Sequence, residues 1–271
     1  MRRASWPRLR RSCRLSSTPR SADMHPIVPM AVITVGFSAL LWCGMLWLYS
    51  GRTMRFVRLV WFGLPLSAIV NLLVKGPLGA GGGDLAGIEP GLGLDTPVWF
   101  LIFLFLLAPV FEELIKAMPA VLPQVRRRMG TEGDALWTGM ALGMGFGLGE
   151  AIYLAWQVVA AGAYAEYPWY AFTGFFGERL LVVFMHAMMT GVLFRIAQRG
   201  RPVLGYLAAV GLHALLNSGA MLYQLELAPG WAANAALGVM LVAFALLFDR
   251  IRPKRAAAER SEDTVYYSSG S

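Results

Sequence analysis

Cysteine is almost absent from this chain of 271 residues, which contains only Cys13 and Cys43. Two isolated cysteines exclude a disulfide framework and a CxxC metal site. Charge is also scarce: Asp, Glu, Lys and Arg make up 15% of the residues, against about 25% in soluble domains. Hydrophobic residues reach 57%, and the mean hydropathy is +0.55. These values exclude an ordinary soluble domain and indicate an integral membrane protein.

Seven apolar stretches are each long enough to cross a bilayer as a helix, which requires about 18 to 25 residues. They are found at residues 27–49, 57–74, 97–122, 135–161, 171–197, 202–222 and 231–249. The hydrocarbon interior offers no water to the backbone, so these stretches must be helical and packed together. The sequence therefore predicts an all-α fold, a polytopic bundle of about seven transmembrane helices in a lipid bilayer.

Positive charge alternates between the loops, and this alternation predicts the orientation of the bundle. Basic clusters follow the first, third, fifth and seventh stretches, at residues 52–58, 126–128, 199–201 and 250–255. The intervening loops carry acidic residues without Lys or Arg, at residues 76–96, 162–170 and 223–230. Lys75, at the outer edge of the second stretch, is the one exception. The positive-inside rule then predicts an external N-terminus and a cytoplasmic C-terminus.

Composition divides the chain into three regions. Residues 1–24 are rich in arginine and lack periodicity, so we expect a disordered basic arm, with Met24 as an alternative start. Residues 25–250 form the transmembrane domain, and residues 251–271 a polar cytoplasmic tail. The arm supplies most of the net charge of +8, so the basic balance predicts no nucleic-acid partner. We expect the Gly-rich stretch 76–96 to be a flexible loop.

Ionisable residues interrupt four of the apolar stretches. Glu112 and Glu113 lie in the third stretch, Glu150 in the fourth, His186 in the fifth and His213 in the sixth. A charge at the bilayer centre costs about 3 kcal/mol, so such residues are normally functional. With about 1.5 Å of helix rise per residue, Glu113 and both histidines lie about 14–16 Å from the cytoplasmic ends of their helices, and Glu150 about 22 Å. We therefore expect them to share one site near the midplane.

Helical spacing relates further residues to this site. Glu112 and Lys116 are four residues apart, which predicts an intrahelical ion pair that lowers the cost of burial. His213 and Asn217 are also four apart and can offer two ligands to one ion. Glycines recur at the same spacing before Glu150, at residues 139, 143 and 147. They allow a neighbouring helix to approach closely.

A third spacing links Arg179 to His186, since residues seven apart also lie on one helix face. Two imidazoles, several carboxylates and an amide oxygen suit a divalent metal, Zn²⁺ in particular, with an open position for water. A nearby glutamate would accept the proton of that water.

Other protease mechanisms are disfavoured. The chain contains no HExxH motif. Residues 81–84 match the GxGD string of intramembrane aspartyl proteases, but they are expected in an external loop and no span carries a second Asp in its interior. Ser218 lacks the glycine that a rhomboid-type GxSG motif requires, because Leu216 stands there.

Four segments, in order, resemble the PrsW and YhfC-type membrane proteins, relatives of the CAAX-protease and bacteriocin-processing superfamily. The segments are FEELIKA, GMGFGLGEAIYLA, ERLLVVFMHAMMTG and LHALLNSG, within residues 97–222. The Glu-Glu-x-x-Lys form is PrsW-like, whereas Gly-Glu-Ala-Ile and the Glu-Arg before the histidine are YhfC-like. PrsW-like proteins usually carry Glu-Asn where this chain has Glu150-Ala151, and an Asp-type residue is common where Asn217 stands.

The resemblance implies an intramembrane metalloprotease that cleaves a membrane-embedded or membrane-associated protein or peptide. It also implies a location in the plasma (inner) membrane of a prokaryote. Glu112 or Glu113 would activate the metal-bound water, with Glu112 favoured, and Lys116 would pair with the other carboxylate.

For the metal itself, the resemblance implies that His186 and His213 are ligands. Asn217 or Glu150 would complete the ligand shell or stabilise the oxyanion. Zn²⁺ is the expected ion.

Two other functions would use the same residues. A proton- or ion-coupled transporter would use Glu150, His186 and His213 as a proton relay. Such carriers usually contain inverted repeats, and the two halves of this sequence show no similarity. A catalytically silent membrane scaffold would keep the site without turnover. Metal content separates the protease from the transporter, and substrate turnover separates it from the scaffold.

Overall fold

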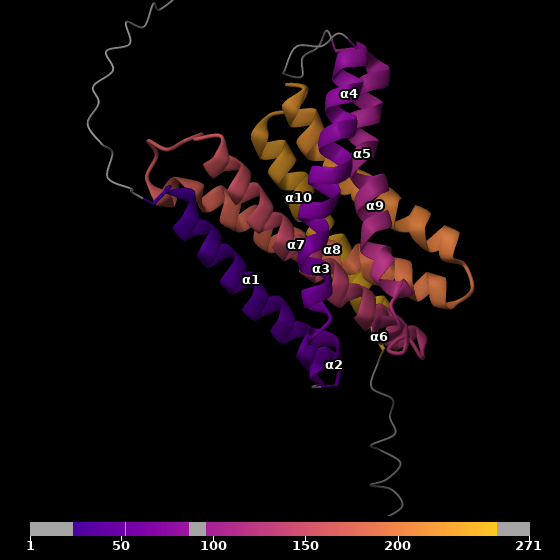
Figure 1. Cartoon of the computed structure of the whole chain (residues 1–271). Coiled ribbons are helices and arrows are strands. Elements are labelled where there is room, and N and C mark those ends of the chain that lie inside the picture. The colour runs from indigo at the N-terminus through magenta and orange to yellow at the C-terminus, as the bar shows by residue number, and fades with distance from the viewer. Residues whose placement is uncertain (1–23, 52, 87–95, 254–271) are drawn as a thin grey trace, which may run out of the picture.

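The computed structural model describes residues 24–51, 53–86 and 96–253. Ten α-helices run through these segments, and no strand occurs in them (Figure 1). The helices are α1 Ile27–Tyr49, α2 Met54–Val57, α3 Val60–Val70, α4 Gly76–Ala86, α5 Val98–Ala117, α6 Pro123–Arg126, α7 Glu132–Ala160, α8 Thr173–Gln198, α9 Pro202–Gln224 and α10 Gly230–Ile251. The predicted basic arm up to residue 23 and the tail from residue 254 lie outside the described residues.

Within the described residues, seven helical segments are long and apolar enough to cross a membrane, which confirms the predicted polytopic bundle. They are Ile27–Tyr49, Met54–Leu85, Val98–Val121, Glu132–Ala160, Trp169–Gln198, Pro202–Gln224 and Gly230–Ile251. Six of them agree with the predicted stretches to within a few residues. The second span is much longer than predicted, because helix continues through the Gly-rich residues after Lys75.

The expectation of a flexible loop from residue 76 onward is wrong for residues 76–86, which form α4. Gly82 explains why glycine does not prevent a helix here. A Cβ at Gly82 would collide with the rings of Phe100 and Phe103 of α5, so the missing side chain allows α4 to pack against α5. Such packing overrides the weak intrinsic helix propensity of glycine. The rest of the predicted loop, residues 87–95, lies outside the described residues.

Between α3 and α4 the chain forms a π-helical turn, Asn71–Lys75. The second span is therefore one continuous helical rod with a wider turn in its middle. Lys75 lies inside this span instead of at its outer edge, which corrects the position assigned from sequence. A cation at this depth needs a partner, because the bilayer interior does not solvate it.

Helix α7 is the centre of the bundle and packs against both α8 and α3. One face carries Gly139, Gly143 and Gly147, where an added Cβ would meet the backbone of α8. Another face carries Gly145 and Gly149, where it would meet carbonyl oxygens of the second span. The predicted close approach of a neighbouring helix before Glu150 is confirmed. The second glycine face allows α3 to approach α7 equally closely.

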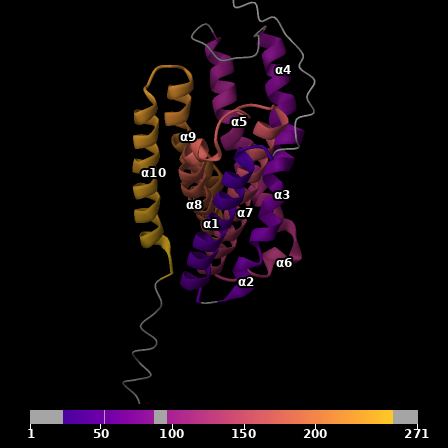
Figure 2. The same ribbon diagram turned by 90° about the vertical axis from the view of Figure 1, so that its left-hand side faces the viewer.

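Helices α2 and α6 and the end of α10, beside which arginine clusters lie in the sequence, come together at one end of the bundle (Figures 1 and 2). Arg55 pairs with Asp134 at the start of α7, and Arg128 donates to the carbonyl of Arg55. Arg199, after α8, pairs with Glu132. At the opposite end His25, before α1, bonds the carbonyl of Ala163. The alternation of charge along the sequence is therefore an alternation between the two ends of one bundle.

Gly143→Ala tests the close packing of α7. The new methyl group would press on the His186 carbonyl and on Thr190, and overpacking of this kind costs about 1–3 kcal/mol. We expect a lower thermal unfolding temperature in detergent micelles. Gly211→Ala is the matched control, because nothing lies within 4 Å of a Cβ there. Equal unfolding temperatures for the two variants would contradict the proposed packing.

Candidate metal centre

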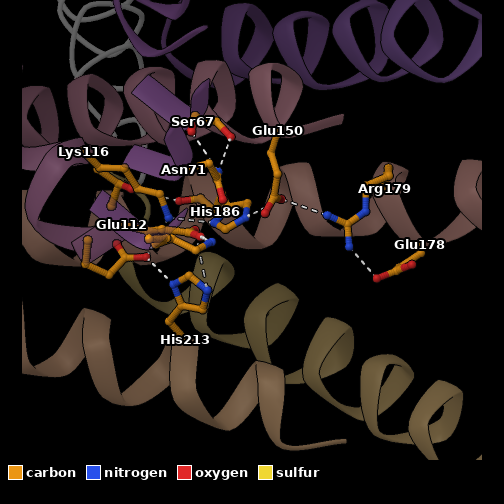
Figure 3. Close-up of polar contacts among 12 residues, drawn as sticks. Ser67, Asn71, Glu112, Lys116, Glu150, Glu178, Arg179, His186 and His213 are labelled. Atoms are coloured by element: carbon orange, nitrogen blue, oxygen red, sulfur yellow. Dashed lines mark hydrogen bonds and ion pairs between the residues drawn. The ribbon is translucent and has the colours of Figure 1, made fainter. Parts of the chain in front are cut away.

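Four helices bring the predicted site residues together inside the bundle. Glu112, Glu113 and Lys116 come from α5, Glu150 from α7, His186 from α8 and His213 from α9. Figure 3 shows Glu112, Glu150, His186 and His213 directed toward a common region between these helices. The ring centroids of the two histidines are 5.3 Å apart. The common depth predicted from helical rise therefore corresponds to direct proximity.

The two glutamates of α5 have different partners. Lys116 lies three residues after Glu113, and its Nζ donates to Glu113 Oε1 at 2.7 Å, with both side chains fully buried. Glu112 instead accepts a bond of 2.6 Å from Lys75 of the π-helical turn. The ion pair that spacing predicted between Glu112 and Lys116 is therefore wrong. Residues three apart and residues four apart can both make contact on a helix, so spacing alone does not decide which glutamate meets Lys116. Glu112 is paired with Lys75 instead.

His213 is held by the carboxylate of Glu113. Its Nδ1 lies 2.8 Å from Glu113 Oε1, so Nδ1–H donates to the carboxylate and the lone pair of Nε2 stays available. Nε2 lies 3.9 Å from Oε2 of Glu112. A carboxylate on the far nitrogen of a histidine is the usual support for a metal ligand, because it sets both the tautomer and the ring orientation.

His186 has partners at both ring nitrogens. Nδ1 lies 2.7 Å from the Nζ of Lys116, and Nε2 lies 3.2 Å from Glu150 Oε2. The lysine ammonium donates to Nδ1, so Nε2 carries the ring proton and donates to the carboxylate. For His186 to ligate a metal through Nε2, that proton must be released. Phe146 packs edge-on against the ring and fixes its plane.

Arg179 completes the network on the side of Glu150. Its Nη1 donates to Glu150 Oε2 at 2.8 Å, and its Nη2 pairs with Glu178 (Figure 3). Glu150 therefore receives bonds from both Arg179 and His186 on a single oxygen. This orients the carboxylate and balances its charge inside the membrane.

Glu112, His186 and His213 could hold a metal ion. One ligand atom from each lies within 4.8 Å of the others, and all three residues are buried. Oε2 of Glu112 is buried without a hydrogen-bond partner among the described residues, an arrangement that normally costs free energy and calls for a missing partner. Two imidazoles with one carboxylate are a known donor set for catalytic zinc. The residues present therefore fit a divalent metal.

A cavity of about 490 Å³ leads away from this cluster. It runs between α8, α9 and α10 toward Tyr223 and Gly230, near the junction of the last two helices. Glu112 and Glu150 line it, whereas Glu113 is not among its lining residues. Further lining residues are Lys75, Arg179, His186, His213 and Asn217. Asn217 is thus placed one helical turn from His213 in the cavity wall, and its role as a ligand remains a prediction.

Residues 55–248 match the sequence model of the PrsW family intramembrane metalloproteases. The chain belongs to this family. The match extends from α2 into α10 and includes every residue of the cluster. No curated protein and no solved structure is significantly similar to the chain. The PrsW likeness seen in sequence is confirmed, whereas the likeness to YhfC-type proteins and the CAAX-protease superfamily gains no support.

Two cations of the site were not assigned to it from the sequence. Lys75 was visible only as an exception in an otherwise acidic set of loops, and Arg179 only through its seven-residue spacing from His186. Neither signal identifies a partner. Lys75 and Glu112 are 37 residues apart in the chain, so their contact depends on how the second and third spans pack.

Metal content tests the assignment of the histidines. We expect His186→Ala and His213→Ala each to lose bound metal, because each removes one of three nearby ligand atoms. Metal per protein is measured by elemental mass spectrometry after purification in detergent. His25→Ala is the control, because His25 lies before α1 and bonds the carbonyl of Ala163, which follows α7, away from the cluster. Full metal content in the double variant His186→Ala/His213→Ala would rule out this site.

Proposed function

We propose that this PrsW-family protein is a metal-dependent endopeptidase that cleaves a membrane-embedded or membrane-associated protein. One observation carries the proposal: ligand atoms of Glu112, His186 and His213 lie within 4.8 Å of one another beside a cavity of about 490 Å³. Zn²⁺ is the ion that this nitrogen-rich donor set favours over Mg²⁺ or Ca²⁺. A divalent ion bound there would polarise the scissile carbonyl and acidify a water molecule.

Glu150 is the best-placed proton acceptor for this reaction. It lines the cavity next to His186, and it is not needed for the set of three ligand atoms. Arg179 donates to its Oε2 and orients the carboxylate, and this bond does not depend on His186, whose Nε2 binds the metal in this proposal. A positioned base contributes about 10²–10⁴-fold to the rate of such a step.

The resemblance offered Glu113 as an alternative to Glu112 for activating the metal-bound water, but in this proposal Glu113 has a supporting role. It is fully buried, is held by Lys116 and supports Nδ1 of His213. In this proposal Glu112 is a metal ligand instead of the base, Glu113 orients the ligand His213, and Lys116 holds Glu113. Loss of such supporting partners typically costs about 10–100-fold in metal affinity or activity.

The substrate must bring a peptide bond into the membrane interior. The cavity is polar where it meets the cluster, and apolar where Leu216 and Leu237 line it. Small residues of α9 and α10 leave room for an extended backbone, at Ala220, Gly230 and Ala233. An extended segment of a membrane protein fits this shape and polarity.

Glu150→Gln tests the proposed function. The amide keeps the size of the side chain but cannot accept a proton near neutral pH, so we expect cleavage to fall about 100-fold or more. The readout is the appearance of new protein N-termini in membranes of cells that carry the wild type or the variant. Glu166→Gln, in the exposed loop before α8, serves as the control.

The outcome also separates the rival functions. N-termini that appear in cells with the wild type and are missing from cells with the variant identify substrates. If no N-terminus depends on the wild type, the protein acts as a scaffold or as a carrier, and proton-coupled uptake into vesicles distinguishes these two.

The orientation is a further part of the proposal: the end with the arginines, and with it the C-terminus, faces the cytoplasm of a prokaryotic plasma membrane. Reporter fusions truncated after Arg128 and after Ala163 should report opposite sides, because these positions lie at opposite ends of α7. Signals from the same side would contradict the orientation of the spans.

A further inference from the structure

The π-helical turn Asn71–Lys75 places one cation beside the cluster. In this turn the backbone N–H of Gly76 bonds the carbonyl of Asn71, a step of five residues, and the Asn71 side chain bonds the carbonyl of Ser67 (Figure 3). Pro77 is the next residue after Gly76, and a proline ring would clash with the carbonyl four residues earlier in a regular α-helix. A single wider turn inside an α-helix rotates the next helical segment about the axis and is frequent at functional sites.

Lys75 is the residue that this turn directs at Glu112. Its side chain is 21% exposed and lines the cavity, whereas the Glu112 side chain is 2% exposed. The ammonium group binds Oε1 of Glu112 at 2.6 Å. Oε2 of the same carboxylate is buried without a partner in the described part of the chain and lies 3.9 Å from Nε2 of His213. The two oxygens of Glu112 are therefore in different environments.

This difference matters for any ion held by Glu112, His186 and His213. A carboxylate can bind a metal through one oxygen or through both. Binding through both would fill a coordination position that a catalytic zinc site keeps open for water. An ammonium group bound to Oε1 opposes this, because a metal ion on the same oxygen would lie close to the ammonium charge and be repelled by it.

We propose that Lys75 is a positioning residue that holds Glu112 as a one-oxygen ligand and so preserves the open position of the metal site. This inference rests on the proposed metal site. Lysine is suited to the task, because its compact ammonium group is a point charge whose donors are not arranged to match both oxygens of a carboxylate. Arginine would present a planar fork that matches both oxygens of a carboxylate.

The test uses Co²⁺, whose visible absorption reports coordination number and geometry. The wild type, Lys75→Met and Lys75→Arg are purified in detergent, stripped of metal and titrated with Co²⁺. We expect Lys75→Met to bind Co²⁺ about 10–100-fold more weakly, as with other partners of metal ligands, and to lose the intense absorption of a low-coordinate site.

Lys75→Arg keeps the charge and therefore serves as the variant that should fold in every case. We expect its spectrum to change as well, because the guanidinium fork draws Oε2 away from the ion. A wild-type spectrum and affinity in Lys75→Arg would show that charge alone matters and would overturn the proposal. The same result in Lys75→Met would overturn it too.

Leu73→Met is the matched control in the same turn, because Leu73 is 71% exposed and does not line the cavity. Its Co²⁺ spectrum should equal that of the wild type, and a changed spectrum would show that the turn as a whole matters, against a specific role of Lys75. Failure of the wild type to bind Co²⁺ overturns the metal site itself, whereas wild-type binding with unchanged Lys75 variants overturns only the role of Lys75.

Discussion

The cost of placing charge inside a bilayer is the constraint on which this structure depends. Removing one partner of a buried ion pair costs about 3–5 kcal/mol, because the other charge is left uncompensated. Each glutamate of the cluster accordingly has its own cation, in the pairs Glu112 with Lys75, Glu113 with Lys116, and Glu150 with Arg179. Glu178 adds a further carboxylate at Arg179. The side chain of Glu178 is 53% exposed, so inside the bundle three carboxylates are balanced by three cations.

Glycine gives the cluster its geometry. Backbone contacts at Gly143 and Gly147 bring α7 against α8 at the level of His186, and contacts at Gly145 and Gly149 bring it against the second span. A helix held on two faces by its backbone has little freedom to rotate or slide. Glu150, at the end of this glycine-rich segment, is therefore set in a fixed relation to His186, as a preorganised site requires.

The sequence predicted the helices and the depth of the site, but not the pairing of its charges. Depth depends on the constant rise of an α-helix, so Glu113, His186 and His213 could be placed at one level from residue numbers alone. Pairing depends on how each helix is rotated and on which helices are neighbours. Glu112 and Glu113 differ by about 100° around α5, and this rotation decides which of them meets Lys116. Lys75 was out of reach, because Gly76 and Pro77 indicated the start of a loop, whereas they follow a π-helical turn inside the second span.

The pairing also has a consequence for biogenesis, since the spans leave the ribosome in order. When α5 enters the bilayer, Lys75 has already been synthesised and Lys116 belongs to the same helix, so both glutamates of α5 have a cation at hand. Glu150 has no such advantage, because Arg179 belongs to the next span. The charge of Glu150 therefore gains this partner only once α8 has been synthesised.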